Sequence, residues 1–317
     1  MKKVVLSLIL TLVSIGTAFS QFDAQFSQYM FHNSAFNPAA VGEDEMIQTT
    51  LQFRNQWIGM PNAGQTTAFS INSPIKIGSA LNGVGLNVLN DVVGQFINRS
   101  GHLQYAFKKQ IKSGTLSLGV GLGVVTVGFN GADSVHKVTI GTYYDFENDQ
   151  VIPKTNVQGT SFDMNVGAYY STPTYYAGLS YSHLNSPTVL WGETSKFKET
   201  GTLYLTGGYN WVLPDSKYVV KPSTLLKTDF TSLQLDVSTR LEYDNKYWGG
   251  MSYRIQDAVV FLAGINAAGG LSVGVSWDLP TSQILTVSQA SLELLVSYNF
   301  EYVFGQKKSK FKSIRIL

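Results

Sequence analysis

The clearest alternation of apolar and polar positions in the chain runs from Thr231 to Asn245. One parity is apolar and holds Leu233, Leu235, Val237, Leu241 and Tyr243, and the other is polar and holds Gln234, Asp236, Ser238, Arg240, Glu242 and Asp244. Because successive side chains of a strand point to opposite faces, the stretch is predicted to be a strand with one apolar and one polar face. Its length is near the roughly 9–11 residues of a tilted transmembrane strand, although a long strand of a soluble sandwich would show the same pattern.

The same alternation recurs along most of the chain. Further stretches begin near Leu51, Leu103, Leu116, Phe162, Leu203, Leu271 and Leu292. The 3.6-residue period of an amphipathic helix is found over no useful length. With weaker stretches included, the sequence predicts about fourteen strands, an even number as in single-chain bacterial barrels.

The connections between these strands sort by length. Every second connection is short, and the short ones are 112–114, 172–174, 214–216, 244–246 and 268–270. The intervening connections include the longest, which are 128–158, 184–198 and 279–290. Outer-membrane barrels have short periplasmic turns and long external loops, whereas a soluble sandwich has no reason to sort its loops in this way. The pattern therefore favours an all-β, transmembrane antiparallel barrel.

Composition agrees with a barrel that is apolar outside and polar inside. Charged residues make up 14% of the chain and aromatic residues 13%, and the mean hydropathy of +0.02 is too polar for a helical membrane protein. Aromatic residues gather near the ends of the predicted strands, as in the interfacial girdles of membrane barrels. The net charge of +2 gives no reason to expect a nucleic-acid partner. The absence of cysteine excludes disulfides, thiolate metal sites and an acylated N-terminal cysteine.

The predicted domain organisation begins with a secretory signal peptide at residues 1–20, which has a basic start, an apolar core and a small-x-small cleavage site. A polar and aromatic N-terminal segment follows at 21–45, then the barrel at 46–304 and a basic tail at 305–317. With an even number of strands, we expect both the segment and the tail on the periplasmic side. The tail is either a docking peptide or a solvated chain end.

Candidate chemistry is sparse, and the sequence predicts no catalytic residue, cofactor or metal site. Gly119, Gly121 and Gly123 lie on the inward parity of a strand with no helix after them, so we interpret them as relieving crowding in the barrel. Ser100 and His102 share a strand face, as in a barrel hydrolase, but a catalytic pair also needs an orienting third group. Inward charges such as those at 236–244 either line a channel or pair across the lumen.

Several motifs occur in order along the chain. They are Gln25-Phe26-Ser27-Gln28-Tyr29-Met30, Asn37-Pro38-Ala39 with Gly42, Arg54-Asn55-Gln56-Trp57-Ile58-Gly59, Asn90-Asp91-Val92-Val93-Gly94, and near the end Ser276-Trp277-Asp278 and Leu292-Glu293-Leu294. Together they resemble the PorP/SprF family over the whole mature chain. The chain departs from the family pattern at Ala40-Val41, at Asn62 and Gly64, and at Leu292, where the family often has histidine.

The resemblance implies an outer-membrane barrel of the type IX secretion system in a Gram-negative bacterium. It implies outer-membrane lipids, a periplasmic ring of a lipoprotein and its soluble companion, and in some relatives a surface adhesin used in gliding, as partners. The residues singled out for partner binding or for a plug are Gln28, Tyr29, Phe31, Asn37, Pro38, Arg54, Gln56, Trp57, Asp91, Gly94, Lys307, Lys308 and Lys310.

The dense aromatic residues of the N-terminal segment need covering, so the segment either plugs the lumen, packs on a partner or only starts the barrel correctly. Arg54 and Gln56 are expected to face the lumen, where the arginine fork could hold a plug. Asn37-Pro38 is expected to stop any helix and turn the chain into the first strand. The main alternative function is a passive porin, which an ordered plug would oppose.

Overall fold

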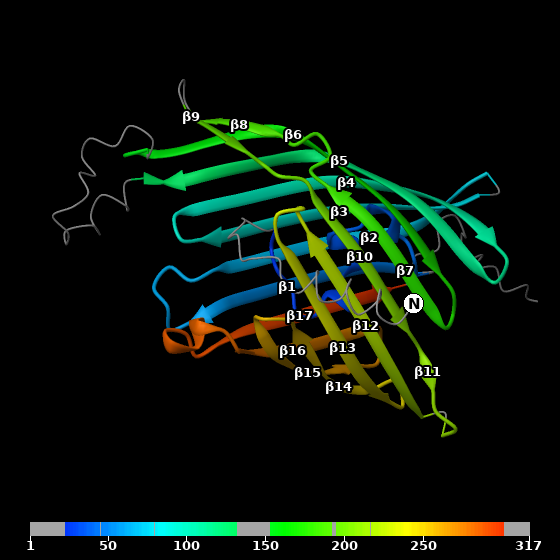
Figure 1. Ribbon diagram of the computed structural model, residues 1–317. Coiled ribbons are helices and arrows are strands. Elements are labelled where there is room, and N and C mark those ends of the chain that lie inside the picture. Colours follow the sequence, from blue (N-terminus) through cyan, green and yellow to red (C-terminus); the bar gives the residue numbers. More distant parts are fainter. Residues whose placement is uncertain are drawn as a thin grey trace, which may run out of the picture.

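Fourteen antiparallel strands form a closed barrel in the computed structural model, which confirms the predicted fold (Figure 1). The structure describes residues 23–44, 46–78, 80–131, 153–191, 195–215 and 217–300. The barrel strands are β1 (Ile47–Ile58), β2 (Gln65–Ile77), β3 (Ala80–Val93), β4 (Phe96–Ile111), β5 (Gly114–Asn130), β6 (Asn156–Ser171), β7 (Tyr175–Ser182), β10 (Thr202–Tyr209) with its continuation β11 (Trp211–Val212), β12 (Tyr218–Thr228), β13 (Leu233–Tyr243), β14 (Tyr247–Arg254), β15 (Ala258–Asn266), β16 (Leu271–Pro280) and β17 (Ala290–Phe300).

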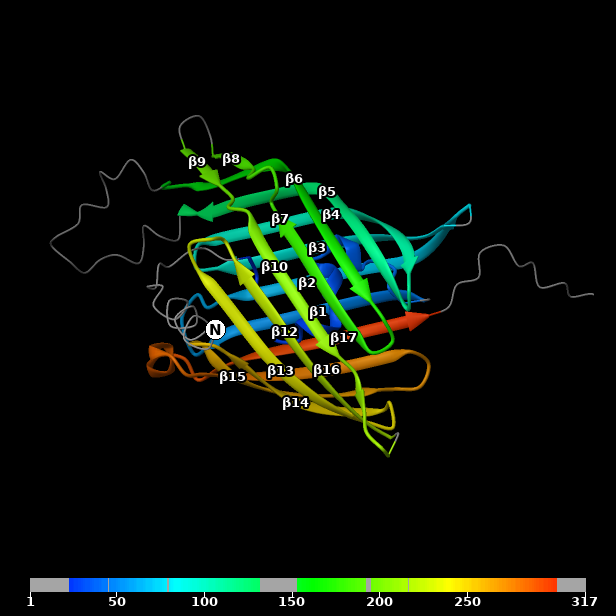
Figure 2. The same ribbon diagram turned by 45° about the vertical axis from the view of Figure 1, so that its right-hand side comes forward.

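The barrel closes because the first and last strands pair, with Ile47 of β1 opposite Phe300 of β17. The only interruption in neighbour-to-neighbour pairing among the described strands is the hairpin of β8 (Thr188–Trp191) and β9 (Ser195–Lys198), which forms a sheet of its own. Strands β7 and β10 pair across this insertion, and Figure 2 shows β7, β10, β12 and β13 side by side. No free edge therefore interrupts the ring of strands, as a hydrocarbon environment requires.

The strands alternate between a lipid-facing apolar side and a buried polar side. On the outer face Leu103 is 70% exposed and Leu118 55%, whereas the inward Gln104 and Ser117 are buried. Strand β13 shows the same division, but Asp244 does not face the lumen as the parity had suggested. Asp244 lies in the tight turn after β13, where its φ of 53° is the left-handed conformation that such turns need, and it pairs with Lys246 at 3.0 Å.

The connections separate into two ends of the barrel, which their lengths predict only in part. The turns after β2, β4, β6, β11, β13 and β15 lie at one end, which we call the turn end. The other end, which we call the loop end, carries the longest connections, after β5, β7 and β16, together with short ones at 94–95 and 255–257 (Figure 2). At the loop end the β8–β9 hairpin packs on the barrel, where the Trp191 indole donates a hydrogen bond to the carbonyl of Val127 at 2.9 Å. The 3-10 helix η4 (Gln283–Thr286) lies in the β16–β17 connection. In the described part of the chain, no helix has the length and apolar character to cross a bilayer.

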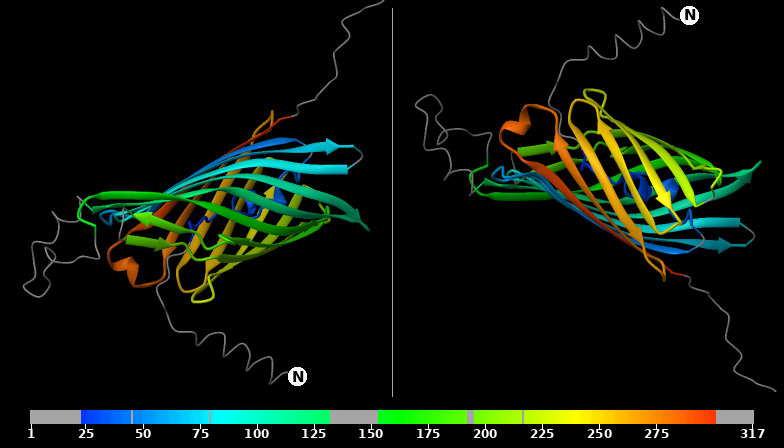
Figure 3. Two further views of the ribbon diagram at one scale, coloured as in Figure 1. Left: turned by 90° about the horizontal axis from the view of Figure 1, so that it is seen from above. Right: turned by 90° about the horizontal axis from the view of Figure 1, so that it is seen from below.

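Residues 23–44 lie inside the barrel, and we call them the lumen segment (Figures 1 and 3). The segment contains three short 3-10 helices, η1 (Tyr29–Phe31), η2 (Asn33–Ala35) and η3 (Pro38–Ala40). It starts at the loop end, where Asp23 contacts His183, and reaches the turn end, where the Gly42 amide donates to Asn72. The expected placement of this region on the periplasmic side is therefore not confirmed, because the segment runs through the lumen.

Two glycines of the wall let the lumen segment approach it closely. A Cβ on Gly119 of β5 would collide with the backbone of Pro38 and Ala39, and a Cβ on Gly83 of β3 would collide with the carbonyl of Val41. Glycine removes the side chain that would hold two backbones apart. The inward Gly119 thus relieves crowding inside the barrel, as its parity predicts.

Candidate functional site

A cluster of buried charges lies in the middle of the lumen, and we call it the charged cluster. It consists of Arg54, Asp236, Arg254, Asp278 and Glu293, whose side chains are at most 2% exposed. Arg54 lies 2.8 Å from Asp278 and 3.4 Å from Glu293. Arg254 lies 3.0 Å from Asp236 and 3.2 Å from Asp278. Arg54 therefore bridges two carboxylates and Arg254 three, since Arg254 also lies 3.3 Å from the more exposed Asp257, and Asp278 joins the two arginines.

Strand register brings these charges together. Arg54 in β1 is opposite Glu293 in β17, and Asp236 in β13 is opposite Arg254 in β14. Strand β15 lies between β14 and β16, and its Ala258 is opposite Arg254. The small side chain of Ala258 leaves space for the Arg254 guanidinium to reach Asp278. The cluster is thus assembled from neighbouring inward positions of the barrel wall.

The lumen segment enters the charged cluster at Ser27. The Ser27 hydroxyl donates to Asp278 at 2.6 Å and accepts from Arg54 at 2.9 Å and from Arg254 at 3.1 Å. The backbone amides of Ser27 and Gln28 donate to the two oxygens of Glu293 at 2.8 and 2.9 Å. Hydrogen bonds that involve charged groups are stronger than neutral ones, so this is the firmest attachment of the segment to the wall.

Aromatic residues of η1 make the next attachment along the segment. The Tyr29 hydroxyl lies 3.0 Å from the Ser238 hydroxyl and 3.3 Å from that of Ser223. The Phe31 ring lies 4.6 Å from the Trp248 ring, and the Arg240 guanidinium lies 4.0 Å over the Phe31 ring. Phe31 therefore sits between a wall indole and a wall cation, a contact worth about 0.5–2 kcal/mol.

The part of the segment between His32 and Asn37 is held by neutral polar contacts. The His32 ring nitrogens lie 3.0 Å from the Gln52 amide oxygen and 2.7 Å from the Ser70 hydroxyl. The Asn37 side chain accepts from the Ala39 amide at 2.9 Å and donates to the carbonyl of Ala168 at 3.2 Å. Pro38 follows as the first residue of η3, where its missing N–H costs no helical bond.

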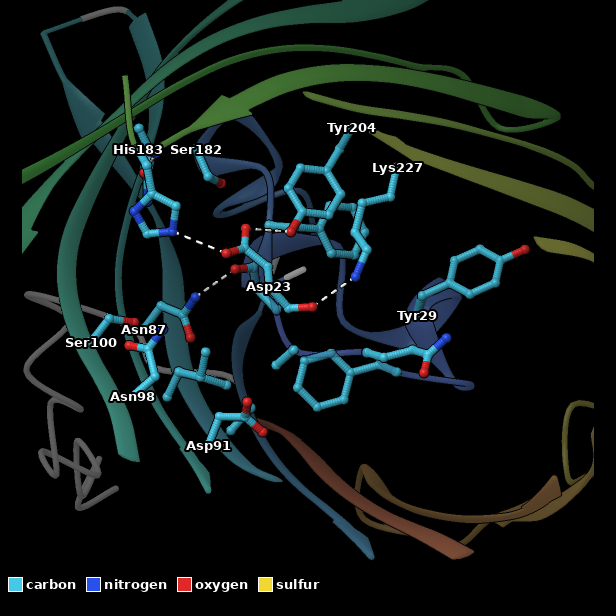
Figure 4. Close-up of a pocket in the computed structure, with 18 of the residues that line it drawn as sticks. Asp23, Tyr29, Asn87, Asp91, Asn98, Ser100, Ser182, His183, Tyr204 and Lys227 are labelled. Atoms are coloured by element: carbon cyan, nitrogen blue, oxygen red, sulfur yellow. Dashed lines mark hydrogen bonds and ion pairs between the residues drawn. The ribbon is translucent and has the colours of Figure 1, made fainter. Parts of the chain in front are cut away.

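Asp23 anchors the start of the segment at the loop end (Figure 4). Its carboxylate lies 3.0 Å from His183 Nε2 and accepts from the Tyr204 hydroxyl at 2.6 Å, and its carbonyl accepts from Lys227 Nζ at 2.7 Å. His183 Nδ1 lies 2.9 Å from Asp163. We call this arrangement the Asp23 anchor.

Burial and charge act in opposite directions on the Asp23 anchor. Burial alone would raise the pKa of Asp23, but the charge and the hydrogen bond of His183 hold it well below its usual range. Burial would lower the pKa of His183, yet the carboxylates of Asp23 and Asp163 raise it to about 11. Aspartate and imidazolium are therefore the charge states at neutral pH.

The other residues singled out from the sequence are more dispersed. Gln56 donates to the Gln25 side chain at 3.4 Å, and Trp57, with a φ of 53°, marks a register shift in β1. Asp91 accepts from Thr66 at 2.6 Å, and Gly94 has a φ of 62° in the β3–β4 turn. Lys307, Lys308 and Lys310 lie outside the described residues.

Sequence reasoning did not find the partners of Arg54 as one site. Asp278 and Glu293 each occupy an inward position of their strand, and Arg254 follows the same parity in β14, so their direction could have been read from the alternation. No local signal says which of these charges meet. Asp23, which precedes every strand, carried no signal at all.

Among the described residues, the histidine that meets a serine is His32, which lies 2.7 Å from Ser70 and has the neutral Gln52 amide at its other ring nitrogen. Ser100 and His102 do not form the pair that the sequence suggested. His102 Nε2 lies 2.8 Å from Asp163, which also contacts His183, so His102 belongs to the chain of ionisable groups behind the Asp23 anchor. Within the described residues, no group of three or more histidines and carboxylates is placed to hold a metal ion. The lumen geometry is that of a fixed internal segment.

The sequence matches the family described as type IX secretion system membrane protein PorP/SprF over residues 18–298. The chain belongs to the PorP/SprF family. The match includes the lumen segment and every strand of the barrel, which makes this PorP/SprF protein an outer-membrane component of type IX secretion. No curated protein matches the chain.

Solved structures share the barrel architecture of this PorP/SprF protein at low identity. The CymD monoaromatic hydrocarbon channel is 11% identical with a TM-score of 0.50, covering 92% of this chain and 97% of that one. The P. putida toluene transporter TodX is 11% identical with a TM-score of 0.47, covering 85% and 94%. The Acinetobacter baumannii outer membrane protein Omp33 is 8% identical with a TM-score of 0.44, covering 81% and 99%. At these identities the likeness concerns the fold alone.

Proposed function

We propose that this PorP/SprF barrel is a closed structural component of the type IX secretion machinery, which docks a periplasmic ring at its turn end and surface cargo at its loop end. The observation that carries the proposal is the occupied lumen. Residues 23–44 are fixed at the loop end by the Asp23 anchor, in the middle by the charged cluster and at the turn end by Gly42. A protein whose lumen is filled in this way is suited to assembly rather than to conduction.

The energetics of the charged cluster favour a segment that stays in place. Removing Ser27 from the cluster would take a hydrogen-bond partner from both arginines and expose Asp278 and Glu293 to a partly empty lumen. Leaving a buried charged group without one of its hydrogen-bond partners costs about 1–3 kcal/mol or more, although the arginine–carboxylate pairs themselves remain. In a porin, the lumen segment would have to leave the lumen at this free-energy cost before solute could pass. We therefore place the porin function second.

The turn end is the side that we assign to the ring. Short turns face the periplasm in outer-membrane barrels, and the last described residue, Phe300, lies at this end beside Ile47. The basic tail with Lys307, Lys308 and Lys310 therefore starts on the periplasmic side, where an acidic surface of a ring subunit would attract it. We assign docking to this tail and to the turns around it.

The loop end is the side that we assign to cargo. It carries the β8–β9 hairpin and the longest connections, and in outer-membrane barrels these face the cell exterior. A secreted surface protein, such as an adhesin used in gliding, would meet the barrel at this end.

The test is an affinity purification from solubilised outer membranes. A tag inserted after Leu285, which is 58% exposed in the β16–β17 connection, avoids the packed β8–β9 hairpin. We expect the tagged barrel to recover a periplasmic lipoprotein ring. Lys307→Gln with Lys308→Gln should reduce the recovery, whereas the matched control Lys196→Gln with Lys198→Gln, on the exposed face of β9, should not.

The opposite outcome is also informative. Recovery of the barrel alone, together with ion conductance of the intact protein in planar bilayers, would overturn the docking proposal in favour of the porin. Equal loss of the ring in both double variants would show that charge in general, and not the tail, matters.

A further inference from the structure

A cavity of about 480 Å³ opens at the loop end of the lumen, above the charged cluster. It continues into a smaller enclosed space beside Asp23, and Asp91 and Asn98 line both parts (Figure 4). Its volume is within the range of small-molecule sites in proteins. The proposed docking does not use this space, although Asp23 and Lys227 of the Asp23 anchor form part of its wall.

The narrow part of the cavity is rich in hydrogen-bond acceptors. Asn87 is 7% exposed, its amide nitrogen donates to the carbonyl of Ala35 at 2.8 Å, and its amide oxygen has no partner. The Asn98 amide nitrogen donates to Glu199 at 3.0 Å, and its oxygen is likewise buried without a partner. Each amide is oriented by the bond that its nitrogen makes, and its oxygen is enclosed by the wall without a hydrogen-bond donor.

Two carboxyl groups, those of Asp91 and Glu199, line the same wall, and burial raises the pKa of Glu199 to about 7. Asp91 accepts a hydrogen bond from Thr66, and Glu199 accepts one from Asn98. Both donors are neutral side chains. Three cations also line the two parts of the cavity, but each is at most 6% exposed and already engaged. Lys227 donates to the Asp23 carbonyl, Arg254 donates to carboxylates of the charged cluster, and His183 pairs with Asp23 and Asp163.

The wide part of the cavity is apolar on one side. Phe96, Phe197 and Trp57 line it, together with Leu233 and aliphatic neighbours. Phe96 and Phe197 pack with their ring centres 6.0 Å apart, so this wall is formed by side chains that already hold each other in place. An apolar body would lose its water there, and the aromatic faces would also attract a positive charge.

We propose that the cavity is a binding site for an organic cation, with an ammonium or guanidinium head seated against Asp91 and Glu199 and an apolar body against Phe96 and Phe197. A head with several N–H donors can satisfy both carboxyl groups at once. An anion would meet carboxylates, and a neutral apolar molecule would leave the acceptors unpaired. The head group can come from a free amine or from a lysine or arginine side chain of an exported protein.

The test is calorimetric titration of the full chain in detergent micelles with three probes of one size. They are 2-phenylethylammonium, neutral 2-phenylethanol and anionic 3-phenylpropanoate. We expect the ammonium to bind at least about tenfold more tightly than the alcohol, since one good charge contact is worth about a factor of ten, and the anion to be rejected. Asp91→Asn and Glu199→Gln should each weaken the ammonium by about tenfold, and the matched control Asp244→Asn at the turn end should leave it unchanged.

A second arm separates the two sources of the head group. N-acetyl-Phe-Lys-amide is compared with the same peptide acetylated on the lysine side chain. Binding of the lysine peptide and not of its acetylated form assigns the site to a peptide side chain, and binding of the small amine alone assigns it to a free amine. Equal affinity for amine and alcohol, no binding of any probe, or an equal loss in Asp244→Asn would overturn the proposal. The ring-recovery experiment does not depend on this cavity, so the docking proposal and the cation-site proposal can be contradicted independently.

Discussion

At the scale of single residues, Arg54 is the group whose loss should most affect the lumen segment. It bridges Asp278, Glu293 and the Ser27 hydroxyl. We expect Arg54→Ala to weaken the attachment of the segment by about 3–5 kcal/mol, because two buried carboxylates lose their closest cation. Hydrogen exchange at the Ser27 and Gln28 amides should accelerate by roughly a hundredfold or more, since exchange follows the local opening free energy.

The control is Arg99→Ala, which removes an exposed arginine that bonds only to Asn90 on the outer face. This variant should exchange like the parent protein. If Arg54→Ala left the exchange at Ser27 unchanged, the charged cluster would not be what holds the segment.

The Asp23 anchor should depend on pH in one direction only. The pKa of His183 is raised to about 11, so its contribution is complete below the unperturbed value of about 6.5 and is lost as the pH rises toward 11. The pKa of Asp23 is depressed, so the anchor keeps its strength down to the acid range. Asp163, Lys227 and Tyr204 also face this pair.

We therefore expect exchange at the amides that follow Asp23, corrected for the intrinsic rate, to be flat from about pH 5 to 6.5 and to accelerate from about 6.5 to 10. His183→Gln should exchange faster at pH 6 and lose most of this dependence. A profile that is flat over the whole range in the parent protein would contradict the assigned ion pair, and an unchanged slope in His183→Gln would show that a group other than His183 causes the acceleration.

At the scale of elements, contact between η3 and β5 depends on a missing side chain. Gly119 faces the backbone of Pro38 and Ala39, so Gly119→Ala would force η3 away from the wall. Overpacking of this kind costs about 1–3 kcal/mol. We expect a lower urea midpoint for loss of the folded band on unheated gels. Gly101→Ala is the matched control, because a Cβ at Gly101 of β4 would meet nothing within 4 Å, and equal midpoints for the two variants would contradict the close packing.

The barrel strands could be predicted from the sequence, because each strand carries its own alternation and every turn its own length. Strand β13 is an example, with its inward Asp236 and Arg240. The β8–β9 hairpin could not be predicted, because its position rests on contacts such as that of Trp191 with Val127, far away in the chain. The path of the lumen segment is set by contacts between residues even farther apart in the sequence, such as Ser27 with Asp278. No local sequence pattern indicates such contacts.

At the scale of the whole molecule, the two ends of the barrel should face opposite sides of the outer membrane. The chain has no cysteine, so a single introduced thiol reports its own position. Leu285→Cys lies at the loop end and Ser113→Cys in a short turn at the turn end. We expect a membrane-impermeant maleimide to label Leu285→Cys on intact cells and to label Ser113→Cys only after the outer membrane is permeabilised. The reverse result would invert the orientation on which ring and cargo are assigned.

Closure of the lumen is a property of the whole barrel, and conductance measures it directly. Barrels of eight strands are filled by their own side chains, whereas those of 16–18 strands enclose water, so about fourteen strands leave a lumen that only a segment such as 23–44 can fill. We expect the intact protein in planar bilayers to pass almost no current, and a deletion of residues 23–36 to conduct.

If that deletion fails to fold, Ser27→Glu provides a second route, because it places a third carboxylate against Asp278 and Glu293 and should expel the segment by repulsion. The opened lumen would expose Arg54 and Arg254 together with Asp236, Asp278 and Glu293, so a slight preference for cations is expected. Current through the intact barrel as large as that through either variant would mean that the segment does not close the lumen, and the porin function would then replace the proposed docking role.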